Sequence, residues 1–184
     1  MGVIDMADMR KYKSQRDIQA ALITCLNRRS FNQITVNDIC QEGLVGRSTF
    51  YHHYPDKYAV LSELVEQQAA RFDELLDARL VDPLADSGLL ALYTALSEDV
   101  FMILPLLKVH EPEGDLSARY LASLRRHAAQ LLPEVSQPVP QDFLLEIYAS
   151  TAYTAITWAL RRGSADQIST FMNGLVKSVL TGQS

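Results

Sequence analysis

The segment from Thr35 to Lys57 constrains the fold more than any other part of the chain, and it reads TVNDICQEGLVGRSTFYHHYPDK. Thr35 suits the N-cap of a helix, because its hydroxyl can accept a hydrogen bond from a first-turn N–H. Apolar residues follow at helical spacing. We expect Gly43 to end this helix, since glycine adopts a positive φ at little cost. A second short helix is predicted from about Gly46 to Tyr54. Two short helices joined by a tight turn predict a helix-turn-helix.

The second of these helices has two chemically different faces. Phe50 and Tyr54 share one face at i, i+4 spacing, and polar side chains occupy the other. A helix of this kind can pack on a small core and present hydrogen-bonding groups to the DNA major groove. We expect Arg47 and His52 to read bases, and His53 to lie at the edge of the core. The full set of predicted DNA-contacting residues is Thr35, Arg47, Ser48, Thr49, Tyr51, His52, His53 and Lys57.

This part of the chain, roughly Arg16 to Leu64, resembles the DNA-binding motif of the TetR/AcrR family of bacterial transcription regulators. The matching segments are ITVNDIC, V-x-R-S-T-F-Y-H-H-Y and DKYAVL. Gly43 and Leu44 stand where the family usually has alanine then glycine, and Gly46 stands where a capping serine is common. The resemblance implies that Tyr51 grips the DNA backbone and that the chain forms a dimer.

The head is predicted to be a three-helix unit, residues 1–57, that begins with a loose arm over residues 1–13. Basic side chains in the arm could reach DNA phosphates, although a solvated tail fits the sequence equally well. Ser14 is expected to cap the first helix. A long helix from Lys57 to about Arg79 then leads into a body, residues 58–184, that shows no period-2 stretch. The predicted fold class is therefore all-α, with a break expected near Pro105.

Charge and composition favour an intracellular DNA-binding protein. The net charge is −5, but residues 1–58 carry eight Lys and Arg against six Asp and Glu, whereas the remainder carries nine against sixteen. A mildly basic head on an acidic body suits a protein that docks DNA at one end. We expect a cytoplasmic protein, because the sequence has neither an apolar run long enough to span a membrane nor a signal-peptide pattern. In that compartment the two cysteines are expected to be reduced and to lie in the core.

We expect no enzyme activity, cofactor or metal site, because no catalytic or phosphate-binding motif occurs. His110 precedes several acids that could in principle bind a cation, but a solvated acidic loop explains them better. His127 stands beside Arg125 and Arg126 and is expected at the surface or at a pocket rim.

The body offers aromatic side chains for an effector pocket and a helix face for dimerisation. Tyrosine pairs an apolar ring with a hydrogen-bonding tip, which suits a mostly apolar ligand inside a helical bundle. The candidate pocket residues are Phe72, Tyr93, Phe101, Tyr120 and Tyr148. Small side chains on the penultimate helix and apolar ones on the last helix predict a four-helix dimer interface. Its candidates are Ala152, Ala155, Trp158, Ala159, Phe171 and Leu175, although both stripes could instead face the subunit's own core.

The sequence thus favours a homodimeric transcription regulator, expected to be a repressor that binds a palindromic operator and responds to a small molecule. The alternative is a regulator or adaptor of the same fold whose body recruits a protein partner.

Overall fold

The computed structural model describes the backbone of residues 6–80, 86–131, 139–163 and 165–181. Within these ranges it also describes the side chains, except those of residues 6–8, 10, 86–87 and 176–181. The chain divides into two compact units. The first comprises residues 1–67 and 105–115, and the second comprises residues 68–104 and 116–184. Within the described residues the elements are helical, and an isolated bridge joins Glu111 to Gly114. The predicted all-α fold is confirmed.

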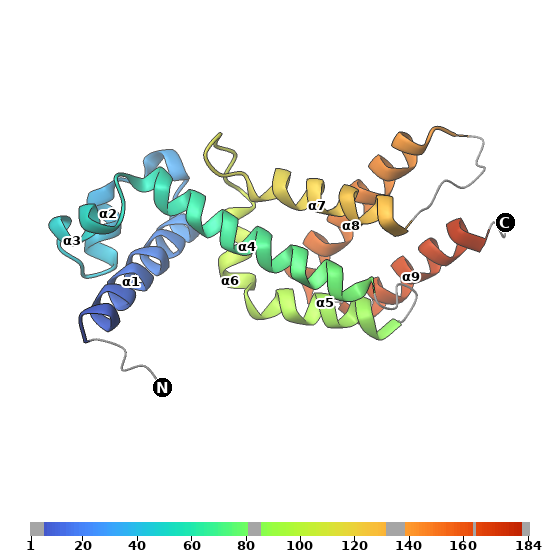
Figure 1. Ribbon diagram of the computed structural model, residues 1–184, viewed down its shortest axis with the longest axis horizontal. Helices are drawn as coiled ribbons and strands as arrows, with labels where there is room; N and C mark the ends of the chain where they lie inside the picture. The colour runs from blue at the N-terminus through green and yellow to red at the C-terminus, as the bar shows by residue number, and fades with distance from the viewer. Residues whose placement is uncertain (1–5, 81–85, 132–138, 164, 182–184) are drawn as a thin grey trace. The chain divides into compact units, whose positions relative to one another are not determined.

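The first unit contains the helix-turn-helix (Figure 1). Its elements are α1 (Met6–Arg28), a 3-10 turn η1 (Phe31–Gln33), α2 (Val36–Glu42), α3 (Arg47–His53) and the first half of α4 (Lys57–Arg79). The first three helices pack on one another and form a small core. That core contains Ile18, Leu22, Phe31, Ile34, Ile39, Phe50 and Leu61, each at most 4% exposed.

The expected loose arm is wrong for residues 6–13, because α1 begins at Met6; residues 1–5 lie outside the described residues. Ser14 lies inside the helix, where its hydroxyl donates to the carbonyl oxygen of Lys11 at 3.3 Å. A serine hydroxyl can bond back to the preceding turn in this way and leave the helix unbroken. The neighbouring Met, Lys, Arg and Gln residues are good helix formers, which favours the extension of α1.

Residues 105–115, which comprise the end of α6 and the loop after it, belong to the first unit. Gly114 lies against α4 so closely that a Cβ atom there would be 2.8 Å from Cγ of Leu61 and 3.3 Å from Cγ2 of Val65. A side chain at this position would therefore force the loop away from α4.

The second unit is a helical bundle. It contains the rest of α4, α5 (Asp86–Glu98), most of α6 (Val100–Leu106), α7 (Leu116–Leu131), α8 (Gln141–Arg162) and α9 (Ala165–Thr181). The main packing pairs are α7 with α8 and α5 with α9. Phe72 and Tyr120 stack at the centre with ring centroids 3.9 Å apart, and both are fully buried.

The break between α5 and α6 lies at Asp99, not near Pro105 as the sequence predicted. The two helices bend by 83° there, and the carbonyl of Asp99 accepts hydrogen bonds from the N–H groups of Met102 and Ile103. The carboxylate of Asp99 also pairs with Arg71 at 2.9 Å. Pro105 lies in the last turn of α6, which ends one residue later at Leu106.

In the described residues, no single helix is both long enough and apolar enough to span a membrane. Only the bent pair Gly88–Glu98 and Val100–Leu106 has that length and apolar character, and only when the two helices are counted together.

Candidate functional site

The turn between α2 and α3 is tight and depends on two adjacent residues. Leu44 has a φ of +52°, and Gly43 has a φ of −83°, so the expected positive φ at Gly43 is wrong. Gly43 is instead required for space: a Cβ atom there would lie 3.0 Å from the carbonyl oxygen of Asp17 and 3.2 Å from Cβ of Ala21. The turn therefore brings α2 into close contact with α1, while Leu44 adopts the left-handed conformation that glycine would adopt more easily.

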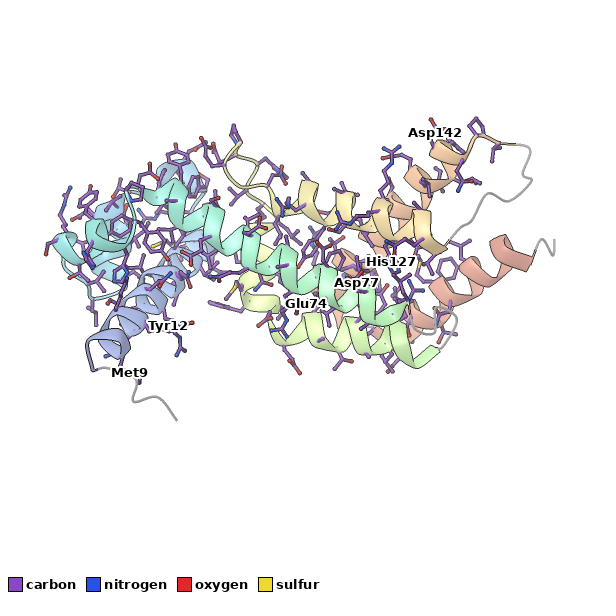
Figure 2. All side chains as sticks on the ribbon, in the orientation of Figure 1. Met9, Tyr12, Glu74, Asp77, His127 and Asp142 are labelled. Carbon is purple, nitrogen blue, oxygen red and sulfur yellow. The ribbon has the colours of Figure 1, made fainter. Side chains whose placement is uncertain are left out.

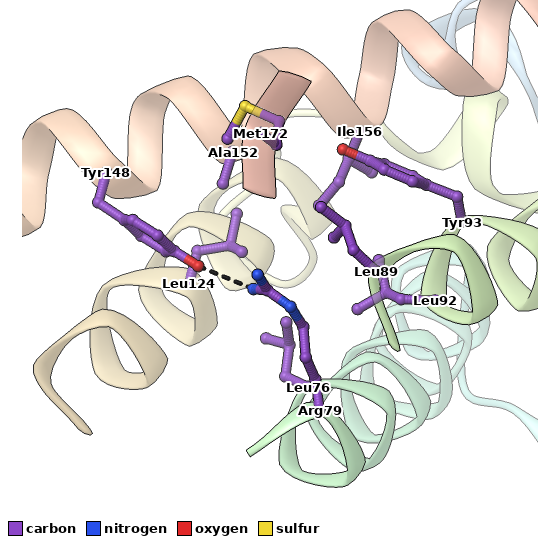
Figure 3. Close-up of a pocket in the computed structure, with 10 residues that line it drawn as sticks. All are labelled: Leu76, Arg79, Leu89, Leu92, Tyr93, Leu124, Tyr148, Ala152, Ile156 and Met172. Carbon is purple, nitrogen blue, oxygen red and sulfur yellow. Dashed lines mark hydrogen bonds between the residues drawn. The ribbon is translucent and has the colours of Figure 1, made fainter. Parts of the chain in front are cut away.

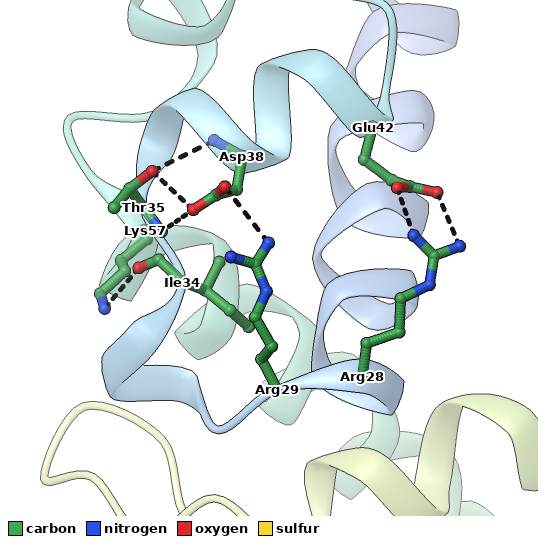
Figure 4. Close-up of polar contacts among 7 residues, drawn as sticks. All are labelled: Arg28, Arg29, Ile34, Thr35, Asp38, Glu42 and Lys57. Carbon is green, nitrogen blue, oxygen red and sulfur yellow. Dashed lines mark hydrogen bonds and ion pairs between the residues drawn. The ribbon is translucent and has the colours of Figure 1, made fainter.

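The start of α2 is held by a capping box (Figure 4). The hydroxyl oxygen of Thr35 accepts from the Asp38 N–H at 3.2 Å, and the Thr35 N–H donates to the Asp38 carboxylate at 2.8 Å. The first of these bonds was predicted from Thr35, whereas the reciprocal bond to Asp38, which completes the capping box, was not. The Thr35 hydroxyl also donates to the Asp38 carboxylate at 2.7 Å, and this bond is the main cause of the lowered pKa of Asp38. The Thr35 N–H and Arg29, 3.2 Å away, lower that pKa further.

Helix α3 presents the two faces that the sequence predicted. Phe50 is fully buried and Tyr54 nearly so, whereas Arg47, Ser48, Tyr51 and His52 are exposed and Thr49 is half-buried. The guanidinium of Arg47 lies 5.9 Å from the centre of the Tyr51 ring. No side chain caps α3, because its N-cap is Gly46. The exposed face thus carries a cation, hydroxyl groups and an imidazole on one short, rigid helix.

The other end of α3 is fastened to α1. Nε2 of His53 lies 3.2 Å from the Ser14 hydroxyl, and Nε2 of Gln19 donates to the Tyr54 hydroxyl at 3.1 Å. Burial lowers the pKa of His53, and the neighbouring His52 and Lys11 lower it further. His53 is half-buried, as expected for the edge of the core. A shallow hollow between the helices is lined by Lys11, Ser14, Ser48, Thr49, His52 and His53.

Lys57 lies at the start of α4 and turns into the first unit. Its ammonium donates to the carbonyl oxygens of Phe31 and Ile34, both at 2.8 Å, and lies 4.5 Å from the Phe31 ring centre. Burial lowers its pKa. Two of the three N–H donors of Lys57 therefore hold the η1 loop. The sequence predicted a phosphate contact for Lys57 and did not predict this role.

The second unit encloses a small cavity of about 20 Å³, room for about one water molecule. Two of the candidate pocket residues, Tyr93 and Tyr148, line it (Figure 3). Phe72 and Tyr120 stack in the core beside one another and are not among its lining residues. Phe101 is 63% exposed on α6 and also lies outside the lining, because the bend at Asp99 changes the direction of its helix.

Two cationic or titratable residues of this unit were not predicted to be internal. Arg79 is 5% exposed, lines the cavity, and donates to the Tyr148 hydroxyl at 3.0 Å. His127, expected at the surface or at a pocket rim, is 3% exposed. Burial lowers the pKa of His127 to about 4, and the charge of Arg79 acts in the same direction against the opposing effect of Asp77 (Figure 2). Helical spacing could have predicted the burial of Arg79, because it lies seven residues after Phe72 and three after Leu76, on the same face of the helix.

Helices α8 and α9 form an open apolar groove. Its lining residues are Ser150, Thr151, Thr154, Ala155, Trp158, Ile168, Phe171 and Met172. Trp158, Phe171 and Leu175 are 43%, 66% and 41% exposed. Ala152 and Ala159, also assigned to a dimer interface, are buried within the chain, and Ala152 lines the cavity. Those two alanines therefore face the subunit's own core.

The described residues contain no group of three or more His, Cys, Asp or Glu side chains placed to hold a metal ion. In the acidic loop, Nδ1 of His110 pairs with Asp115 at 2.8 Å. Cys25 and Cys40 are both buried and unbridged, and burial raises the pKa of each thiol.

Residues 18–64 match the family model of bacterial regulatory proteins, tetR family. No curated protein is significantly similar to the chain in sequence. Several solved structures share its fold. A TetR transcriptional regulator from Streptococcus agalactiae 2603V is 24% identical, with a TM-score of 0.68, over 92% of this chain and 97% of that one.

The second is the dihydroxyacetone kinase operon activator DhaS, 17% identical, with a TM-score of 0.57 over 91% of this chain and 96% of that one. The third is a gamma-butyrolactone receptor (ArpA-like protein), 14% identical, with a TM-score of 0.60 over 90% and 98%. These likenesses extend the common fold over nearly the whole chain. The helix-turn-helix of residues 18–64 is therefore a DNA-binding motif of the tetR family of bacterial regulatory proteins, in a chain whose overall fold is that of the solved TetR transcriptional regulator.

Proposed function

We propose that this regulator is a ligand-responsive repressor that binds a palindromic operator as a homodimer. The observation that supports the proposal is the arrangement of side chains on α3. Phe50 is buried and anchors the helix, whereas Arg47, Tyr51 and His52 are exposed. Rigid support with free hydrogen-bonding groups is what base readout in the major groove requires. In functional terms, residues 1–57 bind DNA, and residues 58–184 bind the effector and the partner subunit.

The DNA contacts divide into two kinds. Arg47 and His52 read base edges, because a guanidinium or an imidazole can hydrogen-bond the groove atoms of a base pair. Tyr51, Ser48 and Thr49 contact sugar and phosphate, which positions the head without specifying sequence. Thr35, at the exposed start of α2, reaches the backbone on the neighbouring strand. Lys57 and His53 support this surface from within, through the loop carbonyls and Ser14.

The dimer forms through the α8–α9 groove. Large apolar side chains such as Trp158 and Phe171 are rarely left on an open surface, and a contiguous patch of them marks an interaction site. The exposed face continues along α8 through Phe143 and Ile147, which are 52% and 50% exposed. Two such helices from each subunit make a four-helix interface with two-fold symmetry.

The effector enters the second unit at the cavity lined by Tyr93, Tyr148 and Arg79. A cavity inside a helical bundle, apolar with a few polar groups, is the usual form of a small-molecule site. The present size accommodates only about one water molecule, so a ligand must bind a different arrangement of the surrounding helices. This requirement links ligand binding to a change in shape.

The proposal is tested by mixing the purified full chain with fragments of its host's genomic DNA and sequencing the fragments retained. A matched variant, Arg47→Ala with His52→Ala, serves as the control for readout by α3. We expect the wild type to enrich one or a few sites with an inverted repeat, and the variant to lose that enrichment. Placing a reporter gene behind the enriched site should lower its expression when the regulator is present.

Two results would contradict the proposal in different ways. Equal enrichment by wild type and variant would remove α3 as the reading element. A reporter that rises in the presence of the regulator would make the protein an activator while leaving its DNA binding intact.

A further inference from the structure

The cavity of the second unit is apolar except at one end. Its aliphatic wall consists of Leu76, Leu89, Leu92, Leu124, Ile156 and Met172. At the polar end Arg79 extends from α4 toward Tyr148 of α8, and its guanidinium points into the ring of lining residues (Figure 3). Because Arg79 is cationic and only 5% exposed at the end of an aliphatic cavity, the site strongly prefers a ligand with a negative charge at that end.

Two tyrosine hydroxyls that can donate hydrogen bonds line the cavity together with Arg79. The Tyr148 oxygen accepts from Nη1 of Arg79 at 3.0 Å, which leaves its own hydrogen to donate. Tyr93 lines the same cavity, and burial raises the pKa of its hydroxyl, so that it too is protonated and able to donate near neutral pH. Guanidinium and hydroxyl donors gathered in this way suit a carboxylate, which is an acceptor only.

We propose that the effector is a small organic carboxylate with an apolar tail, its carboxylate at Arg79 and Tyr148 and its tail against the leucines and Met172. The inference rests on the proposed ligand-responsive function and specifies the class of its ligand. A protonated amine is excluded by the same geometry, because a second cation beside a buried guanidinium is repelled at low effective dielectric. A neutral amide of the same shape keeps the tail contacts and loses the charge-assisted bond, which is about twice as strong as a neutral one.

The position of Arg79 also provides a route from ligand to helix. Arg79 lies in the last turn of α4, and it donates to Tyr148 of α8 and, at 3.4 Å, to Asn173 of α9. A carboxylate that takes over one of these donors changes how α4 is joined to both helices. The tail requires further room, for which Met172 is suited because its unbranched side chain adapts to different shapes.

The test compares probes of matched shape on the full-length protein by isothermal titration calorimetry. One set is hexanoate, hexanamide and hexylamine, and the other is phenylacetate, phenylacetamide and phenethylamine. We expect at least one carboxylate to bind about tenfold more tightly than its amide, and the matching amine not to bind. Arg79→Met should abolish the preference of the carboxylate over the amide.

Two further variants keep the test decisive if Arg79→Met does not fold. Tyr148→Phe removes one hydroxyl from the same cavity and should weaken carboxylate binding severalfold. Arg125→Met removes an exposed arginine on α7, paired with Glu146 at 3.4 Å, and should leave binding unchanged.

An amine or amide that binds as tightly as its carboxylate would overturn the assignment, as would failure of every probe to bind. Carboxylate binding that survives both Arg79→Met and Tyr148→Phe would also overturn it. These failures are distinguishable from failure of the proposed function, because operator binding is measured separately and does not depend on the probe.

Discussion

Leu44 and Gly43 divide between them two tasks that one glycine often performs. Leu44 supplies the positive φ of the turn, +52°, and Gly43 supplies the space through which α2 approaches Asp17 and Ala21 of α1. Leu44 is 93% exposed, so its side chain contributes little packing in return for the strain. The chain therefore keeps the turn at the cost of an unfavourable residue.

Replacing Leu44 with glycine should stabilise the head. The left-handed conformation costs a non-glycine residue about 1–2 kcal/mol, and glycine loses about 0.5–1 kcal/mol of this advantage to its greater freedom in the unfolded chain. We expect the free energy of unfolding, measured with urea, to rise by up to about 1 kcal/mol. Gly43→Ala should lower it by about 1–3 kcal/mol, because its Cβ would press on the Asp17 carbonyl. A stabilising Gly43→Ala would show that the turn has another conformation.

Arg47→Ala should relax sequence preference at one base pair of the operator. A bidentate contact to a base contributes about 1–3 kcal/mol of discrimination, and its loss is confined to the base pair that it reads. The measurement is fluorescence anisotropy on operators that carry each single substitution. Arg28→Ala is the matched control, because Arg28 is an exposed arginine of the same unit that pairs with Glu42 at 2.9 Å (Figure 4). An unchanged preference profile for Arg47→Ala would remove it from base readout.

Lys57→Met should destabilise the first unit. Its ammonium donates to two carbonyl oxygens, and hydrogen bonds to charged groups contribute about 1.5–3 kcal/mol. We expect a loss of that size in urea unfolding, with weaker operator binding. The slope of log affinity against log salt decides whether its third donor also reaches a phosphate: a slope reduced by about one unit would show the phosphate contact, and an unchanged slope would confine Lys57 to the loop.

His127 should make stability fall as the pH is lowered. Its pKa is about 4 in the folded chain and about 6.5 unfolded, so the unfolded state binds a proton first. Its stabilising contribution is present above pH 6.5 and is lost between there and about pH 4, with a loss of about 2 kcal/mol by pH 5. Urea unfolding at pH 7 and pH 5 measures this difference.

The controls for that titration are two histidine variants. His127→Gln should reduce the difference between pH 7 and pH 5, whereas His110→Gln, at an exposed site beside Asp115, should leave most of it in place. An undiminished difference in His127→Gln would assign the effect to other groups.

Ala155→Arg should separate the subunits. Ala155 lines the α8–α9 groove, and a charge buried there without a partner costs several kcal/mol. The matched control is Ala122→Arg on the exposed side of α7. Sedimentation velocity should show a monomer for the first variant and a dimer for the second, with operator affinity lost only in the first. Leu175→Glu tests α9 in the same way, and a dimer in both groove variants would place the interface elsewhere.

Local rules predicted the parts of the molecule that depend on neighbours in sequence. The faces of α3 follow from the helical period, and the cap at Thr35 follows from its hydroxyl. The same rules failed where tertiary packing decides. A positive φ was predicted at Gly43 because it is the glycine of the turn, but glycine is needed there for the close contact with α1. Arg79 and His127 carry the polar character of surface residues, and only the packing of α4, α7 and α8 places them inside. Phe101 was misplaced because the bend at Asp99 changes its helix direction.

Hydroxyl-radical footprinting of a selected genomic fragment shows whether two α3 helices bind one operator with two-fold symmetry. We expect two protected half-sites in inverted orientation, with centres about 34–36 Å apart or a small multiple of that spacing. Tyr51→Ala should weaken protection of both half-sites together. A single protected patch without inverted symmetry, bound by a folded protein, would contradict the claim.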